Sequence, residues 1–160
     1  MEKVFENYPK QIWKSFQSNS LSYYLDIQYF ALQGDYPKDL EKKLVYAVED
    51  FYVFKANPRD YCHFHILPTY RLENNPLPYV PTGKIFIRFT PGVQAKEKSV
   101  VLHDLDYCID EISNEAMHTA WIKSCHDDAS EALRQLASLR NVAQLENAEP
   151  QMLMPKRGFL

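Results

Sequence analysis

The chain has little glycine, little cysteine and no long apolar segment, and each shortage excludes a class of structure. Only 4 of its 160 residues are Gly, against 10 Pro, which predicts stiff loops. No apolar run approaches the roughly 20 residues of a membrane span, so we expect no contact with a membrane. The three cysteines, at 62, 108 and 125, fit neither a pairwise disulfide framework nor a Cys-x-x-Cys metal site. An odd count without a signal-like start predicts a reduced, cytoplasmic protein.

The chain also has no excess of positive charge. The formal net charge of -3 argues against binding of nucleic acid by the charge of the whole protein. RNA contact is therefore expected only at a local basic patch, or on a ribosome that holds the substrate. The hydrophobic share of 46% and charged share of 24% are typical of a globular protein. Eleven Tyr and nine Phe can supply core or a surface for stacking.

Apolar spacing predicts an α+β fold. Residues 20–32 and 37–46 have helical spacing, and Phe51 and Val53 mark a short strand or an irregular segment. Strands are expected at 61–67, 84–90 and 99–105, with a long proline-rich loop at 68–83. Helices at the N-terminal side and one C-terminal helix should pack on one face of a small antiparallel sheet. We expect a single domain over 1–140 and a tail over 141–160. The C-terminal helix is predicted from a stripe formed by Met117, Trp121, Cys125, Ala129, Ala132, Leu136 and Leu139.

The three predicted strands bring basic side chains to one face. In an extended 61–67 segment, His63 and His65 point to the face opposite Cys62, Phe64 and Ile66. Lys84 and Arg88 share one side of their strand, with Ile85, Ile87 and Phe89 on the other. The last strand adds His103. If the strands pair, one polar sheet face presents His63, His65, Arg88 and His103, which predicts a surface that binds or cleaves RNA.

Imidazoles and a guanidinium match the needs of RNA cleavage. A base must activate the 2′-hydroxyl, a cation must stabilise the phosphorane-like transition state, and an acid must protonate the leaving oxygen. We assign base and acid to His65 or His103, and phosphate stabilisation to Arg88. A metal site of His63, His65 and His103, or histidines that only bind their neighbours, are the alternatives.

Other candidate residues receive simpler interpretations. His118 and His126 are expected on a solvated helix face, and Trp121 in the core rather than on a base-stacking surface. Cys62 and Cys125 are expected to be core residues. The sequence contains no nucleophile motif, glycine-rich phosphate loop or paired-carboxylate spacing that would indicate another chemistry.

Two motifs carry a resemblance to a known family. The segment His-Phe-His-Ile-Leu at 63–67, followed by Glu-Asn-Asn-Pro-Leu-Pro at 73–78, resembles the middle of the YafO family of bacterial type II toxins. The resemblance extends loosely over residues 20–140. It implies a RelE-like α+β domain that acts as a ribosome-dependent mRNA interferase, an endoribonuclease that needs no metal or cofactor. A cognate antitoxin, mRNA and the ribosome are its implied partners, in a homodimer or a toxin–antitoxin hetero-oligomer.

The motif assigns further RNA-contacting residues. Only His63, His65, Asn74 and Asn75 match the family's motif directly. We expect Asn74, Asn75 and Arg71 to position RNA, with Lys84 adding charge. An acidic stretch from His103 to Asp106, the negative net charge and the many aromatic residues favour an alternative. The alternative is a small acidic phage- or plasmid-encoded inhibitor that occupies a partner's nucleic-acid site.

Overall fold

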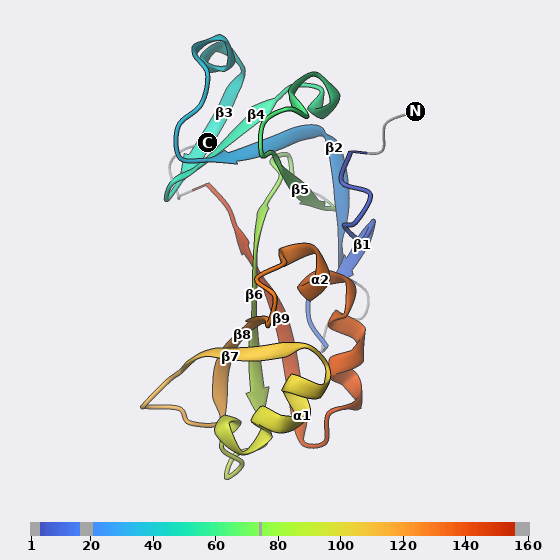
Figure 1. The fold of residues 1–160 in the computed structure, drawn as a ribbon, viewed down its shortest axis with the longest axis vertical. Coiled ribbons are helices and arrows are strands. Elements are labelled where there is room, and N and C mark those ends of the chain that lie inside the picture. The colour runs from blue at the N-terminus through green and yellow to red at the C-terminus, as the bar shows by residue number, and fades with distance from the viewer. Residues whose placement is uncertain (1–3, 17–20, 74, 156–160) are drawn as a thin grey trace. The chain divides into compact units, whose positions relative to one another are not determined.

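Strands dominate the architecture (Figure 1). The computed structural model describes residues 4–16, 21–73 and 75–155. Within these residues, nine strands form two sheets, and the helices are short. The predicted α+β fold, with helices packed on one face of a small RelE-like sheet, is therefore wrong. The elements are β1 (Gln11–Trp13), β2 (Ser22–Gln33), η1 (Lys38–Lys43), β3 (Leu44–Val48), β4 (Phe51–Lys55), η2 (Pro58–Tyr61), β5 (Leu67–Leu72), β6 (Val80–Phe89), η3 (Ala95–Lys98), α1 (Ser99–Asp104), β7 (Tyr107–Ile112), β8 (Thr119–Ser124), α2 (Ala129–Arg134), η4 (Leu136–Asn141) and β9 (Leu145–Leu153).

The chain divides into two compact units, where the sequence predicts one domain and a tail. The first unit comprises residues 1–6, 23–81 and 152–160, and the second comprises 7–22 and 82–151. Each unit is thus assembled from separate stretches of sequence. The segment predicted as a tail contains β9, which lies beside β6 in the sheet of the second unit.

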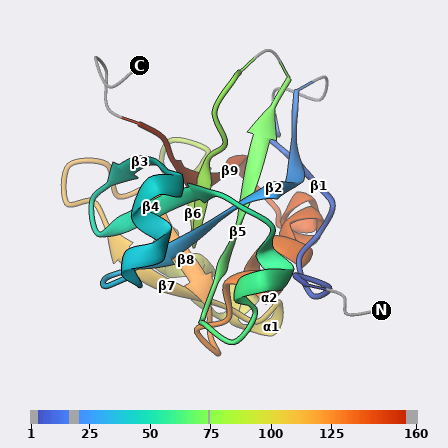
Figure 2. The same cartoon turned by 90° about the horizontal axis from the view of Figure 1, so that it is seen from above.

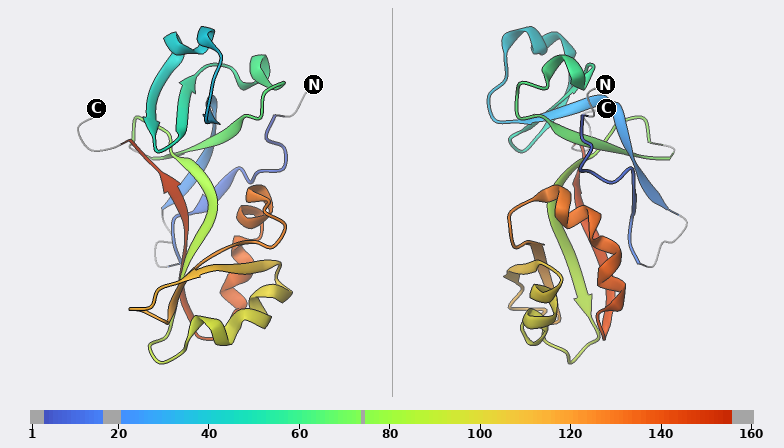
Figure 3. Two further views of the ribbon diagram at one scale, coloured as in Figure 1. Left: turned by 60° about the vertical axis from the view of Figure 1, so that its left-hand side comes forward. Right: turned by 45° about the vertical axis from the view of Figure 1, so that its right-hand side comes forward.

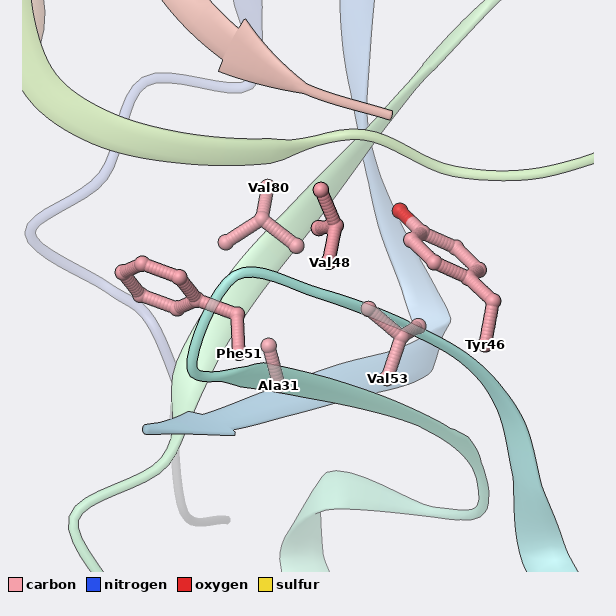
Figure 4. Close-up of a cluster of buried hydrophobic side chains, with 6 residues drawn as sticks. All are labelled: Ala31, Tyr46, Val48, Phe51, Val53 and Val80. Atoms are coloured by element: carbon pink, nitrogen blue, oxygen red, sulfur yellow. The ribbon is translucent and has the colours of Figure 1, made fainter. Parts of the chain in front are cut away.

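The first unit is built on the strands β5, β2, β4 and β3, which neighbour one another in that order (Figure 2). Both faces of this sheet are buried. Ala31, Val53 and Tyr46 belong to one cluster of core side chains, which point toward one another in Figure 4. Phe30 and Phe54, the sequence neighbours of Ala31 and Val53, belong to a second cluster with Leu40 and Tyr61. Because adjacent residues point to opposite faces, the two clusters cover the two sides of the sheet.

The helix predicted at 20–32 is strand β2 in the structure. It pairs antiparallel with β4 through Tyr29–Gln33 and with β5 through Tyr23–Asp26. Its sequence is rich in Tyr, Ile and Phe, which favour strands. Because both faces are buried near Phe30, the alternating pattern that marks a strand is absent there, and the spacing imitates a helix.

The strand predicted at 61–67 is also absent. Asn57 caps the short helix η2 by accepting a hydrogen bond from the Arg59 amide at 3.1 Å, with Pro58 at the first position. The next segment makes turns until Leu67, where β5 begins. The predicted loop at 68–83 therefore contains most of β5 and the start of β6. Pro68 is tolerated in β5 because it lies at the register shift between the Asp26–Thr69 and Ala31–Leu67 pairs of β2 and β5.

The second unit has ferredoxin-like connectivity. Its elements follow the order β6, α1, β7, β8, α2 and β9, and its sheet has the order β7-β8-β6-β9. The strands β7 and β6 both pair antiparallel with β8, and the arrows of β6 and β9 point in opposite directions in Figure 1. The two central strands are therefore β6 and β8.

One face of this sheet carries the helices. Ile85, Ile87 and Phe89 are fully buried on β6, as predicted from their alternation with Lys84 and Arg88. Gly83 lies on the same face, and a Cβ at this position would be 2.8 Å from the Cβ of Ala129 at the start of α2. The helices α1 and α2 lie on the same side of β6 in the left view of Figure 3. Gly83 thus permits a close approach of α2 to β6.

Two predictions for this unit are wrong for local reasons. The segment predicted as a strand at 99–105 forms the helix α1, in which only Leu102 is buried. The predicted helix at 113–139 is instead β8, α2 and η4. The helix α2 begins only after its N-cap, Asp128. The Asp128 carboxylate accepts hydrogen bonds from the Ser130 amide at 3.0 Å and the Glu131 amide at 3.3 Å. The pKa of Asp128 is lowered mainly by a hydrogen bond that the Ser130 hydroxyl donates to its carboxylate at 2.6 Å, and the two amide hydrogen bonds lower it further.

The N-terminal segment completes the helical side of the second unit. The Arg134 guanidinium donates a hydrogen bond to the Asn7 carbonyl at 2.7 Å, and Arg140 lies 4.2 Å from the centre of the Trp13 ring. Cys108 and Cys125 form a disulfide, so the prediction of unpaired cysteines is wrong for these two. In the described part of the chain, no helix has both the length and the apolar composition needed to cross a bilayer.

Candidate functional site

Two aromatic rings lie on the sheet face of the second unit that is opposite to Ile85 and Ile87. Along β6, the side chains of Lys84, Phe86 and Arg88 alternate with the buried ones. Phe86 is directly opposite Trp121 on β8, so both rings are on the same face. Their centroids are 5.2 Å apart and their planes cross at 62°. We call this side of the sheet, which carries Lys84, Phe86, Arg88, Trp121 and Lys123, the outer face.

The two rings are only half-buried. They come from the two central strands, which places them in the middle of the sheet. Large aromatic side chains normally supply core, because burying them stabilises the fold. Here the core lies on the other face, so the two rings offer an apolar surface in the middle of the outer face. The prediction that Trp121 is a core residue is therefore wrong.

Three cations surround the ring pair, and each has an acidic partner. Lys84 Nζ lies 3.1 Å from Asp110, and Lys123 Nζ lies 2.9 Å from Asp127. Arg88 Nε lies 3.7 Å from Glu146. The hydrogen bond and charge of Asp127 raise the pKa of Lys123. Exposed ion pairs contribute only about 0–1 kcal/mol each, so a polyanion can compete with these carboxylates.

Two hollows adjoin the ring pair. The first has a volume of about 320 Å³ and is lined by both rings together with the β7–β8 connection. The second, of about 370 Å³, is lined by both lysines and by residues at the start of α2. One hollow is therefore aromatic and the other is charged. The first is lined by Phe86, Glu111, Ile112, Ser113, Asn114, Glu115, Thr119, Ala120 and Trp121, and the second by Thr82, Gly83, Lys84, Asp110, Lys123, Ser124, Asp127, Asp128 and Ala129.

The predicted histidine face is not formed. His63 and His65 are exposed in the turns between η2 and β5, not on a strand, and the His63 ring packs against Phe64 with centroids 4.3 Å apart. His103 is exposed at the end of α1. Only Lys84 and Arg88 share a sheet face as predicted. The expectation that three strands present all four predicted catalytic side chains on one face is therefore wrong.

The remaining predicted RNA-contacting residues lie in the first unit. The Arg71 guanidinium lies 5.8 Å from the centre of the Tyr24 ring. The Asn75 amide donates a hydrogen bond to the Tyr79 hydroxyl at 2.5 Å, and its oxygen accepts one from the Leu77 amide at 3.1 Å. These bonds give Asn75 a clear role in shaping the turn. Asn74 is outside the described residues.

Sequence reasoning missed Phe86 and Lys123, and it assigned Trp121 to the core. A signal for Trp121 and Lys123 exists in the segment 119–124, where small or apolar side chains alternate with them. The apolar stripe from Met117 to Leu139 led to the prediction of a helix instead, because Trp121 also falls at a helical spacing. The Asp128 cap then marks where the strand region ends and a helix begins.

Two groups of side chains in the described residues place metal-ligating atoms within 4.8 Å of one another. One consists of His103 and the two disulfide cysteines. The other consists of Asp106, His126 and Glu131, in which His126 Nδ1 lies 3.1 Å from the Glu131 carboxylate. That carboxylate raises the pKa of His126. In the second group, the His126 imidazole therefore already has a partner, the Glu131 carboxylate, without an ion.

Comparisons with models of protein families, with curated proteins and with solved structures found no match. Ferredoxin-like connectivity occurs in proteins of many functions, so the arrangement of the chain does not by itself assign an activity. The chemistry of the outer face is the feature from which a function can be argued. It combines half-buried aromatic rings, ion-paired cations and two hollows, one lined by the rings and one by the lysines.

Proposed function

We propose that this protein binds single-stranded RNA on the outer face of its second unit. The observation that carries the proposal is the Phe86–Trp121 pair on the two central strands of a four-stranded sheet. Single-stranded RNA is commonly recognised by sheets of this kind, on which aromatic side chains stack against splayed bases. Each stacked base contributes about 1–3 kcal/mol. The resemblance to the YafO family favours RNA over DNA as the ligand.

The three cations of the outer face can bind phosphates, but they contribute less to the proposed affinity than the aromatic rings do. Lys84 and Lys123 lie on one side of the rings and Arg88 on the other, so a phosphate backbone can follow the sheet face. If each of the three cations contacts one phosphate, the logarithm of the binding constant falls with the logarithm of the salt concentration with a slope no steeper than about -2 for single-stranded RNA. Stacking, which salt affects less, therefore supplies most of the affinity in this proposal. This agrees with the net charge of -3.

Binding is tested with the full chain and a fluorescent single-stranded oligoribonucleotide, by fluorescence anisotropy at several salt concentrations. Trp121→Ala should weaken binding by about 5- to 150-fold, the equivalent of about 1–3 kcal/mol for one lost stack. Trp13→Ala is the matched control, because Trp13 is also partly exposed but packs under Arg140 of η4. Equal affinity of the two variants, each checked for folding, would remove the outer face as the binding surface. Absence of binding by the unaltered protein would reject the proposal.

The resemblance supports a second proposal, cleavage of translated mRNA. In it, the protein is the toxin of a toxin–antitoxin pair in the cytoplasm, and its candidate catalytic residues fall into two separate sets, His63 and His65 in the first unit and Arg88 and His103 in the second. Induced expression should arrest growth and create new mRNA 5′ ends. His65→Ala/Arg88→Ala should abolish both effects while the protein stays folded. Arrest that persists in the folded double variant would exclude both His65 and Arg88 as catalytic residues.

The acidic residues around the rings favour a third candidate, an inhibitor that binds a partner protein. Asp110, Asp127 and Glu146 place negative charge beside each cation, and Glu111 and Glu115 line the aromatic hollow. This candidate predicts a stable stoichiometric complex with a host protein that survives replacement of the histidines. RNA binding lost in Trp121→Ala, with no such complex, favours the RNA proposal.

A further inference from the structure

A histidine and two cysteines converge at one corner of the second unit. His103 is near the end of α1, Cys108 is near the start of β7, and Cys125 directly follows β8. The ligating atoms of all three lie within 4.8 Å of one another. The cysteines are half-buried and the histidine is exposed, so the group is accessible from solvent.

The backbone fixes this convergence. The Asp106 amide donates a hydrogen bond to the His103 carbonyl at 2.9 Å, which closes the turn between α1 and β7. The Cys125 amide donates one to the Asp106 carbonyl, also at 2.9 Å. Asp106 itself has a φ of 66°, in the left-handed region, and this conformation reverses the chain after α1. These main-chain bonds position His103 and Cys125, and the pairing of Cys108 with Lys123 between β7 and β8 positions the third ligating residue.

In the disulfide, the two sulfur atoms are bonded to each other and cannot act as thiolate ligands. Reduction changes this. A phosphine reductant transfers two electrons to the bond and becomes a phosphine oxide with oxygen from water, while the sulfurs become two thiols. Disulfides are rare in reducing compartments, so the dithiol is the form expected there. A divalent ion that binds both thiolates displaces the two thiol protons.

We propose that the reduced protein binds Zn²⁺ through the Cys108 and Cys125 thiolates and a ring nitrogen of His103. Zinc prefers sulfur and imidazole nitrogen in tetrahedral sites, with Zn–S about 2.3 Å and Zn–N about 2.0–2.1 Å. These bond lengths place ligand atoms roughly 3.3–3.8 Å apart, which three groups already within 4.8 Å can reach when the S–S bond opens. Water completes the coordination.

The proposed ion has a structural consequence. In the oxidised protein, the disulfide joins the start of β7 to the end of β8. In the reduced protein, Zn²⁺ joins the same two residues and adds α1 through His103. The corner therefore has a covalent cross-link in one redox state and a metal cross-link in the other. This proposal does not depend on RNA binding.

Cobalt is the probe that tests it. The full chain is reduced with a phosphine, desalted without oxygen and titrated with Co²⁺, whose thiolate charge-transfer band and tetrahedral d–d bands report sulfur ligation. The reduced protein should give both bands, and Zn²⁺ should remove them. The oxidised protein should give neither. Bands of equal intensity in the two redox states, or no bands in reduced protein shown to be folded, would overturn the proposal.

Three variants assign the ligands. His103→Ala changes an exposed side chain, so folding should be retained, and affinity should fall at least about tenfold, since even outer-shell partners of metal sites cost about 10–100-fold. Cys108→Ser should lose the charge-transfer intensity of one thiolate. Cys62→Ser, in the first unit, is the control and should bind like the unaltered protein. An unchanged affinity in His103→Ala, or lost binding in Cys62→Ser, would contradict the proposed ligand set.

Discussion

Replacing Gly83 with alanine should destabilise the second unit strongly. Gly83 has a φ of +89°, a conformation that costs an L-residue about 1–2 kcal/mol. The added methyl group would lie 2.8 Å from Ala129 Cβ and 3.0 Å from Ala129 Cα, and overpacking of this kind costs about 1–3 kcal/mol. Together these terms predict a loss of about 2–5 kcal/mol in the free energy of unfolding.

The two terms can be separated with a second glycine. Gly92 has a φ of +96°, but a Cβ built there would meet no atom within 4 Å. Gly92→Ala should therefore cost only the conformational part, about 1–2 kcal/mol. Adding Ala129→Gly to Gly83→Ala removes the Ala129 methyl group with which the new Cβ clashes. The double variant should therefore be about 0.5–3 kcal/mol more stable than the sum of the two single losses predicts.

Urea unfolding followed by tryptophan fluorescence is the appropriate assay. The chain has two tryptophans, Trp13 and Trp121, and both belong to the second unit, so the signal reports that unit. Equal losses in Gly83→Ala and Gly92→Ala, with no coupling to Ala129→Gly, would refute the close contact between β6 and α2. A larger loss in Gly83→Ala than in Gly92→Ala, which Ala129→Gly partly restores, would support it.

Two further predictions concern stability. Asp128→Ala should cost about 1 kcal/mol at neutral pH through loss of the α2 cap. Because folding lowers the pKa of Asp128, this stabilisation is present above its ordinary pKa of 3.8 and is lost as the pH falls through the folded value, so the two proteins should converge in acid. Reduction of the Cys108–Cys125 disulfide, which closes a loop with a separation of 17 residues, should cost about 3 kcal/mol in chelator-containing buffer, measured by urea unfolding.

Conservative variants provide the controls for both measurements. Asn is as good a cap as Asp but does not titrate, so Asp128→Asn should keep the stability and lose its dependence on acid. A loss of stability in Asp128→Asn equal to that in Asp128→Ala would exclude capping as the cause. Cys108→Ser/Cys125→Ser should unfold at the same urea concentration with and without reductant. A reductant effect that persists in this variant would have to arise elsewhere than in the disulfide.

The sequence predicted those elements whose local pattern has a single interpretation. The alternation from Lys84 to Phe89 has one face polar and the other apolar, and it forms β6 as expected. Phe51 and Val53 lie in β4, the strand option of the prediction. In these places the local preference and the tertiary structure agree.

Elsewhere, tertiary burial concealed the local signal. In β2, Phe30, Ala31 and Leu32 are all buried because the first unit packs against both sides of its sheet, so no alternation was visible. In β8, Trp121 occurs at a spacing that fits a helix as well as a strand. Only the Asp128 cap distinguishes the two readings, because a helix that begins at 129 cannot include Trp121.

The candidate site was harder to predict than the fold, because it depends on strand pairing. Phe86 and Trp121 lie 35 positions apart in sequence, and only the register of β6 against β8 brings their rings together. The predicted histidine face assumed a different pairing, in which 61–67 and 99–105 were strands. Single-sequence patterns specify which side of a strand a residue occupies, but not which strand lies beside it.

The discontinuous composition of the two units bears on how the protein folds during synthesis. The second unit needs residues 7–22 together with strands that extend to residue 151, and the core cluster of the first unit includes Leu153 packed against it. Domains commonly fold one after another as the ribosome releases them. Here the second unit lacks β9 until residue 153 has been made, and the core of the first unit lacks the packing of Leu153 until then. The early strands of the second unit must therefore wait, exposed, for a late partner, and a bound chaperone should raise the folded yield.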